Sequence, residues 1–106
     1  MIYVFDIDNT ICKTTNSDYH LSKPWDDRIA EINELYDSGN TVIYFTARGM
    51  GRTDNNVLEA YKMLYEFTKR QLDSWGARYT SLMLGKPAGD IYIDDKGMHD
   101  ERFFRD

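Results

Sequence analysis

The sequence lacks the features that mark several large classes of protein. Its 106 residues include one cysteine, Cys12, and two prolines. A single cysteine excludes an internal disulfide, so we expect a reducing, cytoplasmic environment and a small, buried role for Cys12 rather than a reactive thiol. The first apolar run is Ile2–Phe5. It is too short for a signal peptide or for the ~20 apolar residues of a membrane span, so we expect a soluble protein with no membrane partner.

Basic residues are also scarce. The chain has 13 Lys and Arg against 18 Asp and Glu, which gives a formal net charge of −5 and an isoelectric point near 4.9. The sequence contains no stripe of basic residues that could follow the phosphate backbone of a nucleic acid, and we therefore expect no nucleic-acid partner. The length predicts one domain over residues 1–106, and a hydrophobic content of 42% can supply its core.

What the sequence does contain is a pair of acids directly after its first apolar run. Asp6 and Asp8 follow a segment, 2–6, that reads as a strand buried on both faces. Residues at i and i+2 of an extended segment project to the same side. The two carboxylates should therefore meet at the carboxyl end of a buried strand, where open α/β sheets bind their ligands. Two carboxylates that close repel each other and need a cation or a shared proton.

A second acidic pair follows a similar apolar run near the other end of the chain. Residues 90–94 read as a strand that ends in Asp94 and Asp95. Alone, this pair would be interpreted as a solvated turn. Together with Asp6 and Asp8, it predicts four acids at one edge of a sheet. Oxygen ligands of this kind suit Mg²⁺.

A hydroxyl and a lysine follow two further apolar runs. Thr46 ends the predicted strand 41–46, and Lys86 comes after the predicted strand 79–84 and a glycine. Each is weak evidence alone, because strand threonines usually pack and lone lysines are usually solvated. In combination, acids, hydroxyl and lysine are the groups that hold a phosphoryl group while a carboxylate attacks it.

These motifs resemble, in order, the four motifs of the haloacid dehalogenase superfamily of phosphohydrolases. The resemblance runs from Met1 to about Lys96. It implies that Asp6 is the nucleophile, that Asp8 is the acid/base, and that Thr46 and Lys86 hold the phosphate. It also implies a Mg²⁺ ion held by Asp6, the backbone carbonyl of Asp8 and Asp94, with Asp95 in or near the coordination shell. A narrower likeness is to small capless members associated with capsule and surface-sugar biosynthesis.

The alternation of strands and helices predicts an α/β fold, with a central parallel sheet and helices on both faces. The expected helices span 25–38 and about 54–75, the latter capped by Thr53 or Asp54. By resemblance, the fold is three-layered and Rossmann-like. The first strand is then central, with the second and third strands on one side and the fourth on the other. The intervals between motifs leave no room for a cap domain. The site should therefore be open, or covered by the loop 11–25 or by a neighbouring subunit of a homo-oligomer.

The resulting hypothesis is a Mg²⁺-dependent phosphomonoesterase that acts on a small phosphorylated metabolite. Substrate contacts are expected from Ala47, Arg48 and His20, with Arg52 as a second cation beside the glycine-rich loop. Solvated roles for these arginines and for His20 stay open. One alternative is a phospho-accepting receiver-like module, but no aspartate follows the strand 41–46, and the later acids come after the lysine. The other is a catalytically silent binding protein on the same fold.

Overall fold

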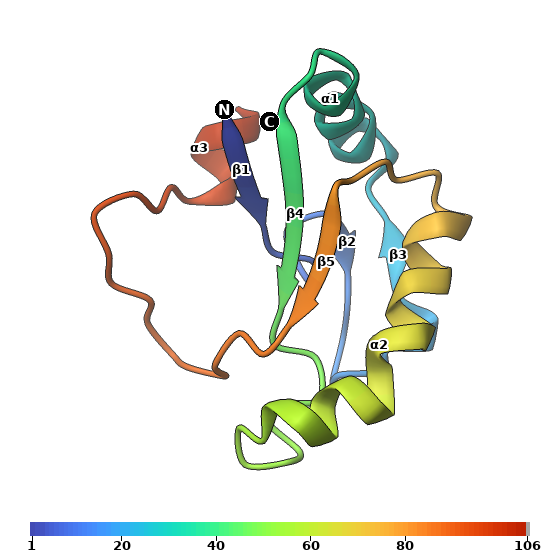
Figure 1. The fold of residues 1–106 in the computed structure, drawn as a ribbon, viewed down its shortest axis with the longest axis vertical. Helices are drawn as coiled ribbons and strands as arrows, with labels where there is room; N and C mark the ends of the chain where they lie inside the picture. The colour runs from blue at the N-terminus through green and yellow to red at the C-terminus, as the bar shows by residue number, and fades with distance from the viewer. Residues whose placement is uncertain (106) are drawn as a thin grey trace.

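The computed structural model describes residues 1–105, and Asp106, the last residue of the expected domain, lies outside the described residues. Three parallel strands, β1 (Ile2–Phe5), β4 (Thr41–Thr46) and β5 (Ser81–Leu84), form a sheet in the order β1-β4-β5 (Figure 1). The chain has a small Rossmann-like α/β fold. Its described residues include no inserted cap domain.

Three helices accompany the sheet: α1 (Asp26–Asp37), α2 (Val57–Ser74) and α3 (Asp100–Phe104). The first two agree with the expected helices to within a few residues. Gly39 (φ 95°) and Gly76 (φ 74°) follow their carboxyl ends in the left-handed conformation that glycine adopts without strain.

The expected cap of the second helix is wrong. Asn56 caps α2, because its side chain accepts the backbone N–H of Glu59 at 3.1 Å. Thr53 cannot take this role, since its hydroxyl donates to the Gly49 carbonyl at 2.7 Å and closes the preceding turn.

The loop 11–25 forms a loose hairpin. Its short strands β2 (Cys12–Lys13) and β3 (Lys23–Pro24) pair antiparallel, and a 3₁₀ helix, η1 (Tyr19–Leu21), lies between them. Cys12 is buried as predicted, and burial raises the pKa of its thiol. Cys12 is therefore a neutral packing group and not a reactive thiolate.

The two faces of the sheet are unequally covered. Side chains of one face are buried with α1 and α2 in the hydrophobic core: Phe5, Val42, Tyr44, Leu82, Leu84, Ile29, Ile32 and Leu72. On the other face Ile2, Val4 and Met83 are exposed, and Ile43 and Phe45 are half-buried. We expected helices on both faces of the sheet, but within residues 1–105 this second face is left largely uncovered.

The expected fourth strand is also wrong. Residues 90–94 adopt no strand conformation, and β1 is consequently at an edge of the sheet and not at its centre. From β5 the chain loops out beyond β1 and returns to α3 near the amino end of β1 (Figure 1, orange to red). A parallel crossover normally needs a dozen or more residues. The connection 85–89 is much shorter, so 90–94 cannot run beside β1 in the parallel direction.

The last helix covers β1 from the buried face. The ring of Phe103 lies edge-on to Tyr3 and Phe5, with centroids 6.1 and 5.5 Å apart. Asp100 pairs with the buried Arg28 of α1 at 2.7 Å. Phe103 and Phe104 thus pack against the hydrophobic core.

Candidate active site

Asp6 and Lys86 meet at the carboxyl edge of the sheet. Asp6 follows β1 and Lys86 comes just after β5, and the Lys86 Nζ lies 3.6 Å from Oδ2 of Asp6. The Asp6 side chain is 34% exposed. Burial is the largest influence on its pKa and raises it, while the charge of Lys86 acts in the opposite direction. The result is a partly desolvated carboxylate beside one cation, which is a suitable environment for a nucleophile.

The backbone around Gly85 fixes the position of Lys86. Gly85 has a φ of 101°, and a Cβ there would lie 3.0 Å from Cγ1 of Val57. A side chain at this position would therefore meet both backbone strain and a clash. The N–H of Lys86 donates to the Thr46 carbonyl at 3.2 Å, which ties the loop after β5 to the end of β4.

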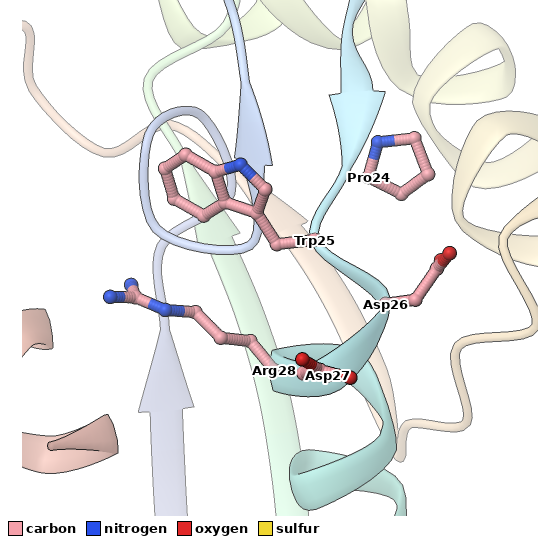
Figure 2. Close-up of a pocket in the computed structure, with 5 residues that line it drawn as sticks. All are labelled: Pro24, Trp25, Asp26, Asp27 and Arg28. Carbon is pink, nitrogen blue, oxygen red and sulfur yellow. The ribbon is translucent and has the colours of Figure 1, made fainter. Parts of the chain in front are cut away.

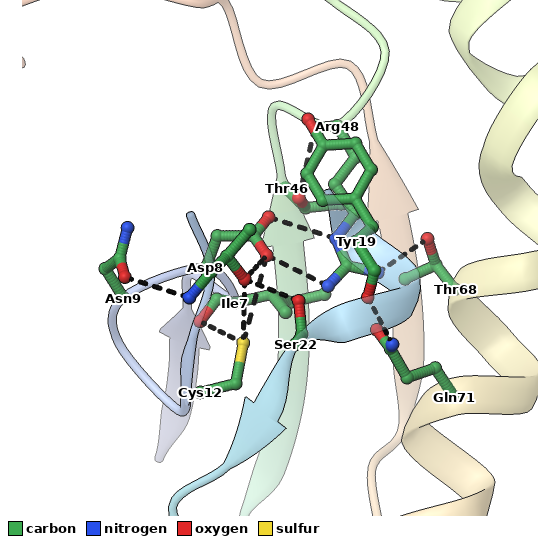
Figure 3. Close-up of polar contacts among 11 residues, drawn as sticks. Ile7, Asp8, Asn9, Cys12, Tyr19, Ser22, Thr46, Arg48, Thr68 and Gln71 are labelled. Atoms are coloured by element: carbon green, nitrogen blue, oxygen red, sulfur yellow. Dashed lines mark hydrogen bonds and ion pairs between the residues drawn. The ribbon is translucent and has the colours of Figure 1, made fainter. Parts of the chain in front are cut away.

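Asp8 is held by a set of donors (Figure 3). Arg48 donates from Nε to Oδ2 at 3.0 Å and from Nη2 to Oδ1 at 2.9 Å. The Thr14 hydroxyl donates to Oδ1 at 2.6 Å. This bidentate geometry fixes the orientation of the Asp8 carboxylate and turns it toward the hairpin.

Arg48 is not placed as a substrate contact, and this expectation is corrected. Its side chain is fully buried and also donates to Oγ1 of Thr68 at 3.3 Å. The ring of Tyr19 covers the guanidinium, with the carbon Cζ 4.6 Å from the ring centroid. Arg48 therefore positions Asp8 from inside the protein.

Thr46 lies at the end of β4 and is fully buried. Its hydroxyl oxygen accepts the backbone N–H of Arg48 at 3.1 Å. The side chain thus shapes the turn that carries Arg48 inward. A contact from Thr46 to phosphate stays a prediction.

An open cleft of about 700 Å³ lies over these groups. Its walls come from the ends of β1 and β4, the hairpin, the glycine-rich turn and the loop after β5. They comprise Asp6, Asp8, Asn9, Thr14, Asn16, Ser17, Tyr19, Ala47, Gly49, Gly51, Arg52 and Ala88. Ala47 thus lines the cleft, and residues of the hairpin form part of its wall. The volume suits a small metabolite.

His20 is not among the residues that line this cleft. Its side chain is 71% exposed, and its nearest charged partner is Asp18 at 3.9 Å. The expected substrate contact is therefore corrected to a surface position on η1. Arg52, which is exposed and lines the cleft, is the arginine available to an anionic substrate.

Asp94 and Asp95 do not reach Asp6 within the described chain. Oδ1 of Asp94 accepts the backbone N–H groups of Lys96 and Gly97, which lower the pKa of Asp94. Asp95 is exposed and pairs with Lys96 at 3.3 Å. The reason is the missing fourth strand, which would have carried both acids to the carboxyl edge.

A single chain consequently does not fit the expected magnesium site. Residues 1–105 contain no cluster of three or more His, Cys, Asp or Glu side chains that could hold a metal. Asp6 has Lys86 as its close partner, and Asp8 is engaged by Arg48.

A second hollow, of about 560 Å³, lies at the start of α1 and is lined by residues 24–28 (Figure 2). The Arg28 guanidinium donates there to the Thr10 carbonyl at 2.9 Å and to Asp100 at 2.7 Å. The polar groups of this hollow thus join α1 to α3 and the first loop, and no pair of reactive groups converges on it.

Sequence reasoning missed the partners that orient Asp8. Thr14 and Thr68 are 54 positions apart in the numbering and carry no motif. Tyr19 lies within the expected loop 11–25, but its stacking on Arg48 does not follow from the sequence. Its carbonyl accepts Nε2 of Gln71 at 2.7 Å, which joins the hairpin to α2. Such contacts depend on tertiary packing, which sequence spacing does not encode.

The sequence matches no protein-family model and no curated protein. A crystal structure from Vibrio cholerae is similar in fold, with a TM-score of 0.86 and 27% sequence identity, and the match covers 96% of this chain and 85% of the other. That protein is described only as a structural-genomics target, so the likeness supports the fold and carries no activity. Within residues 1–105, no helix has the length and apolar character needed to cross a membrane.

Proposed function

We propose that this protein is a phosphomonoesterase that forms a phosphoryl-enzyme intermediate on Asp6. The observation that carries the proposal is the pairing of Lys86 with Asp6, which lines an open cleft beside a second, oriented aspartate. The order of these residues along the chain, and the resemblance of their motifs to phosphohydrolases, support the same reaction.

The proposed reaction has two steps. Asp6 attacks phosphorus, and the bond from phosphorus to the ester oxygen breaks as Asp8 gives that oxygen a proton. Asp8 then takes a proton from the water that cleaves the aspartyl-phosphate, which releases phosphate and restores Asp6. Lys86 offsets the negative charge of Asp6 and the incoming phosphate.

The contact between Asp8 and Arg48 bears directly on the first step. A proton on one oxygen of a carboxyl group makes that oxygen a weaker hydrogen-bond acceptor. One of the two guanidinium contacts, 2.9 and 3.0 Å long, should therefore weaken when Asp8 is protonated. Substrate entry beside Tyr19, which covers Arg48, is a suitable trigger for this change.

Mg²⁺ is the proposed cofactor, and in a bound state it would neutralise the phosphate oxygens. Asp6 and Asp8 are the acids that one chain offers at the cleft, and they do not complete a site. The proposal of a cofactor therefore concerns the assembled protein, and the steps above do not depend on its geometry.

The first test is turnover of p-nitrophenyl phosphate by the purified protein. We expect many equivalents of p-nitrophenol per protein in Mg²⁺, none after EDTA treatment, and recovery when Mg²⁺ is restored. The release of product is followed by absorbance.

The stoichiometry separates the proposal from its alternatives. A receiver-like module would release no more than about one equivalent before it is fully phosphorylated, and a binding protein would release none. Full activity in EDTA would remove Mg²⁺ from the proposal but would leave the aspartyl-phosphate intact.

A second prediction concerns substrate choice. Arg52 is the exposed arginine that lines the cleft, so Arg52→Ala should lower kcat/KM about tenfold for substrates with a second anionic or sugar group. It should have little effect on p-nitrophenyl phosphate. Sugar phosphates are the first group to screen, because the narrower resemblance points to surface-sugar biosynthesis.

The matched control is His20→Ala, whose side chain is exposed outside the cleft. This variant should behave as the unmodified protein with every ester. Equal losses for Arg52→Ala on all substrates, p-nitrophenyl phosphate included, would assign Arg52 to phosphate binding or to the fold instead.

A further inference from the structure

The outer edge of β1 is the least protected part of the sheet. In the described chain β1 pairs only with β4. Ile2 and Val4 on this strand are 70% and 59% exposed. An apolar edge strand with unpaired backbone groups is a template for another strand.

A segment with matching properties follows β5 and is also uncovered. In residues 90–95, here called the exchange segment, Ile91 and Ile93 are 77% and 90% exposed. Isoleucine is a strong strand former, and burial of each side chain stabilises by roughly 1.5–3 kcal/mol. Tyr92 contacts Lys86 and hydrogen-bonds to the loop 87–89. The segment nevertheless has the composition of a buried strand and pairs with no strand within residues 1–105.

Its own β1 cannot be the productive partner. The connection 85–89 leaves β5 at the carboxyl edge of the sheet. The exchange segment then runs back toward the amino end of β1 (Figure 1). Pairing with its own β1 would be antiparallel, and would carry Asp94 and Asp95 to the edge opposite Asp6. Parallel pairing in the same chain is excluded, because the connection 85–89 is too short to cross the sheet.

A second copy of the chain removes this conflict. A two-fold axis beside β1 reverses the direction of the partner's exchange segment, which then runs parallel to this β1. The same operation places this chain's exchange segment on β1 of the second copy, so the contact closes as a dimer. The two copies then share one continuous sheet, and neither β1 remains an edge.

We propose that this protein is a segment-exchanged dimer, in which residues 90–95 of each copy pair with β1 of the other and supply Asp94 and Asp95 to its active site. The inference rests on the proposed function for the role of the two acids, but not for the exchange itself. The parallel register that sets Asp94 of the second copy beside Asp6 also sets Tyr92 opposite Val4.

The charges at the cleft agree with this arrangement. In one copy the negative charges of Asp6 and Asp8 face Lys86 and Arg48, so the site is nearly balanced. Two further carboxylates give it a net negative charge. They also supply the oxygen ligands that Mg²⁺ requires and that a single chain lacks. A cation site would therefore exist only in the dimer.

The side chains that the exchange would cover are apolar and exposed. Ile2, Val4, Tyr92 and the two isoleucines of the exchange segment are all exposed in one copy. Their burial, with the adjoining backbone, would contribute to the ~800 Å² per partner that a standard stable interface buries. Covering this surface would also bury the exposed outer edge of β1.

Cross-linking tests the exchange without any assay of activity. The double variant Val4→Cys/Tyr92→Cys should oxidise to a covalent dimer on a non-reducing gel, since both positions are exposed. The control is Met83→Cys/Tyr92→Cys, which should not cross-link because β5 lies at the other edge. An intramolecular disulfide in the first variant would overturn the proposal, and so would no disulfide at all. Cys12 is buried and should not compete.

Sedimentation provides a second measurement. The unmodified protein should sediment as a dimer, and Ile91→Asp/Ile93→Asp should sediment as a monomer with unchanged helix content. Leu58→Asp, at an exposed position of α2, is the matched control and should remain dimeric. A monomeric unmodified protein at micromolar concentration would contradict the proposal.

Complementation joins the exchange to the chemistry. Asp6→Asn chains and Asp94→Asn/Asp95→Asn chains carry different tags, are co-expressed, and are purified as a mixed dimer. Each parent should be inactive, whereas the mixed dimer should show about half of the native activity, because one of its two sites is intact. An inactive mixed dimer would mean that the acids do not act in trans. If the native protein hydrolyses no ester, the proposed function fails, and the cross-link and sedimentation results still decide the exchange.

Discussion

Asp6→Asn should abolish hydrolysis of p-nitrophenyl phosphate and leave no phosphate on the protein. Asp8→Asn should instead trap phosphate as the covalent intermediate on Asp6. The two residues are the same type, but Asp6 faces Lys86 and Asp8 faces Arg48. Asp8→Asn keeps the nucleophile and loses the acid and base. Nitrophenolate leaves without a proton, so this variant should form the aspartyl-phosphate and then stall.

Radiolabelled phosphate on acid-quenched protein provides the measurement. We expect a loss of turnover of at least about 10³-fold in both variants, with label on Asp8→Asn alone. Label on the Asp6→Asn protein would show that another residue is the nucleophile. Equal turnover by Asp8→Asn and the unmodified protein would remove Asp8 from the chemistry.

A stability measurement is the control that determines whether the Asp6→Asn protein is folded. Because burial raises the pKa of Asp6, its ionised form costs free energy of folding at neutral pH, and this cost disappears as the pH falls through the folded-state pKa. In EDTA at pH 7, Asp6→Asn should therefore melt at the same temperature as the unmodified protein or above it. The difference should shrink toward acid pH.

The parts of the fold that could be predicted from sequence are those that local pattern determines. A buried parallel strand is a short apolar run, so β1, β4 and β5 were identified with the acids and the lysine that follow them. Parallel strands present their carboxyl ends at one edge. The meeting of Asp6 with Lys86, 80 positions away in the numbering, could be expected for this reason and is observed.

The rest depends on partners that the sequence does not specify. Arg48 follows a strand at the rim of the cleft and was expected to reach out to a substrate anion. It turns inward because Asp8, Thr68 and Tyr19 together satisfy it there. The segment 90–94 has the pattern of a strand, but strand formation needs a neighbour, and the length of the preceding loop decides which neighbour can be reached.

Loss of one partner of the ion pair between Asp8 and Arg48 should be the most destabilising single change at the site, and the cost should depend on which partner is removed. Arg48 has a side-chain exposure of 0%, while that of Asp8 is 21%. Asp8→Asn leaves a buried cation with no carboxylate and should lower the free energy of unfolding by about 3 kcal/mol. Arg48→Met leaves a carboxylate that water and Thr14 can still solvate. It should cost less, about 1–2 kcal/mol.

Urea denaturation of the two single variants and of Asp8→Asn/Arg48→Met measures this asymmetry as a double-mutant cycle. The double variant should be more stable than Asp8→Asn alone, because methionine fills the buried space without a charge. Arg78→Met is the control, since its pair with Asp37 is exposed on both sides and its loss should change stability least of the set. If the double variant were the least stable of the set, the guanidinium would be held by Thr68 and Tyr19, and its pairing with Asp8 would serve orientation only. If Asp8→Asn left the free energy of unfolding unchanged, water would hydrate the Arg48 guanidinium once the Asp8 carboxylate is lost. The weakening of this contact that we assign to catalysis would then need no substrate to drive it.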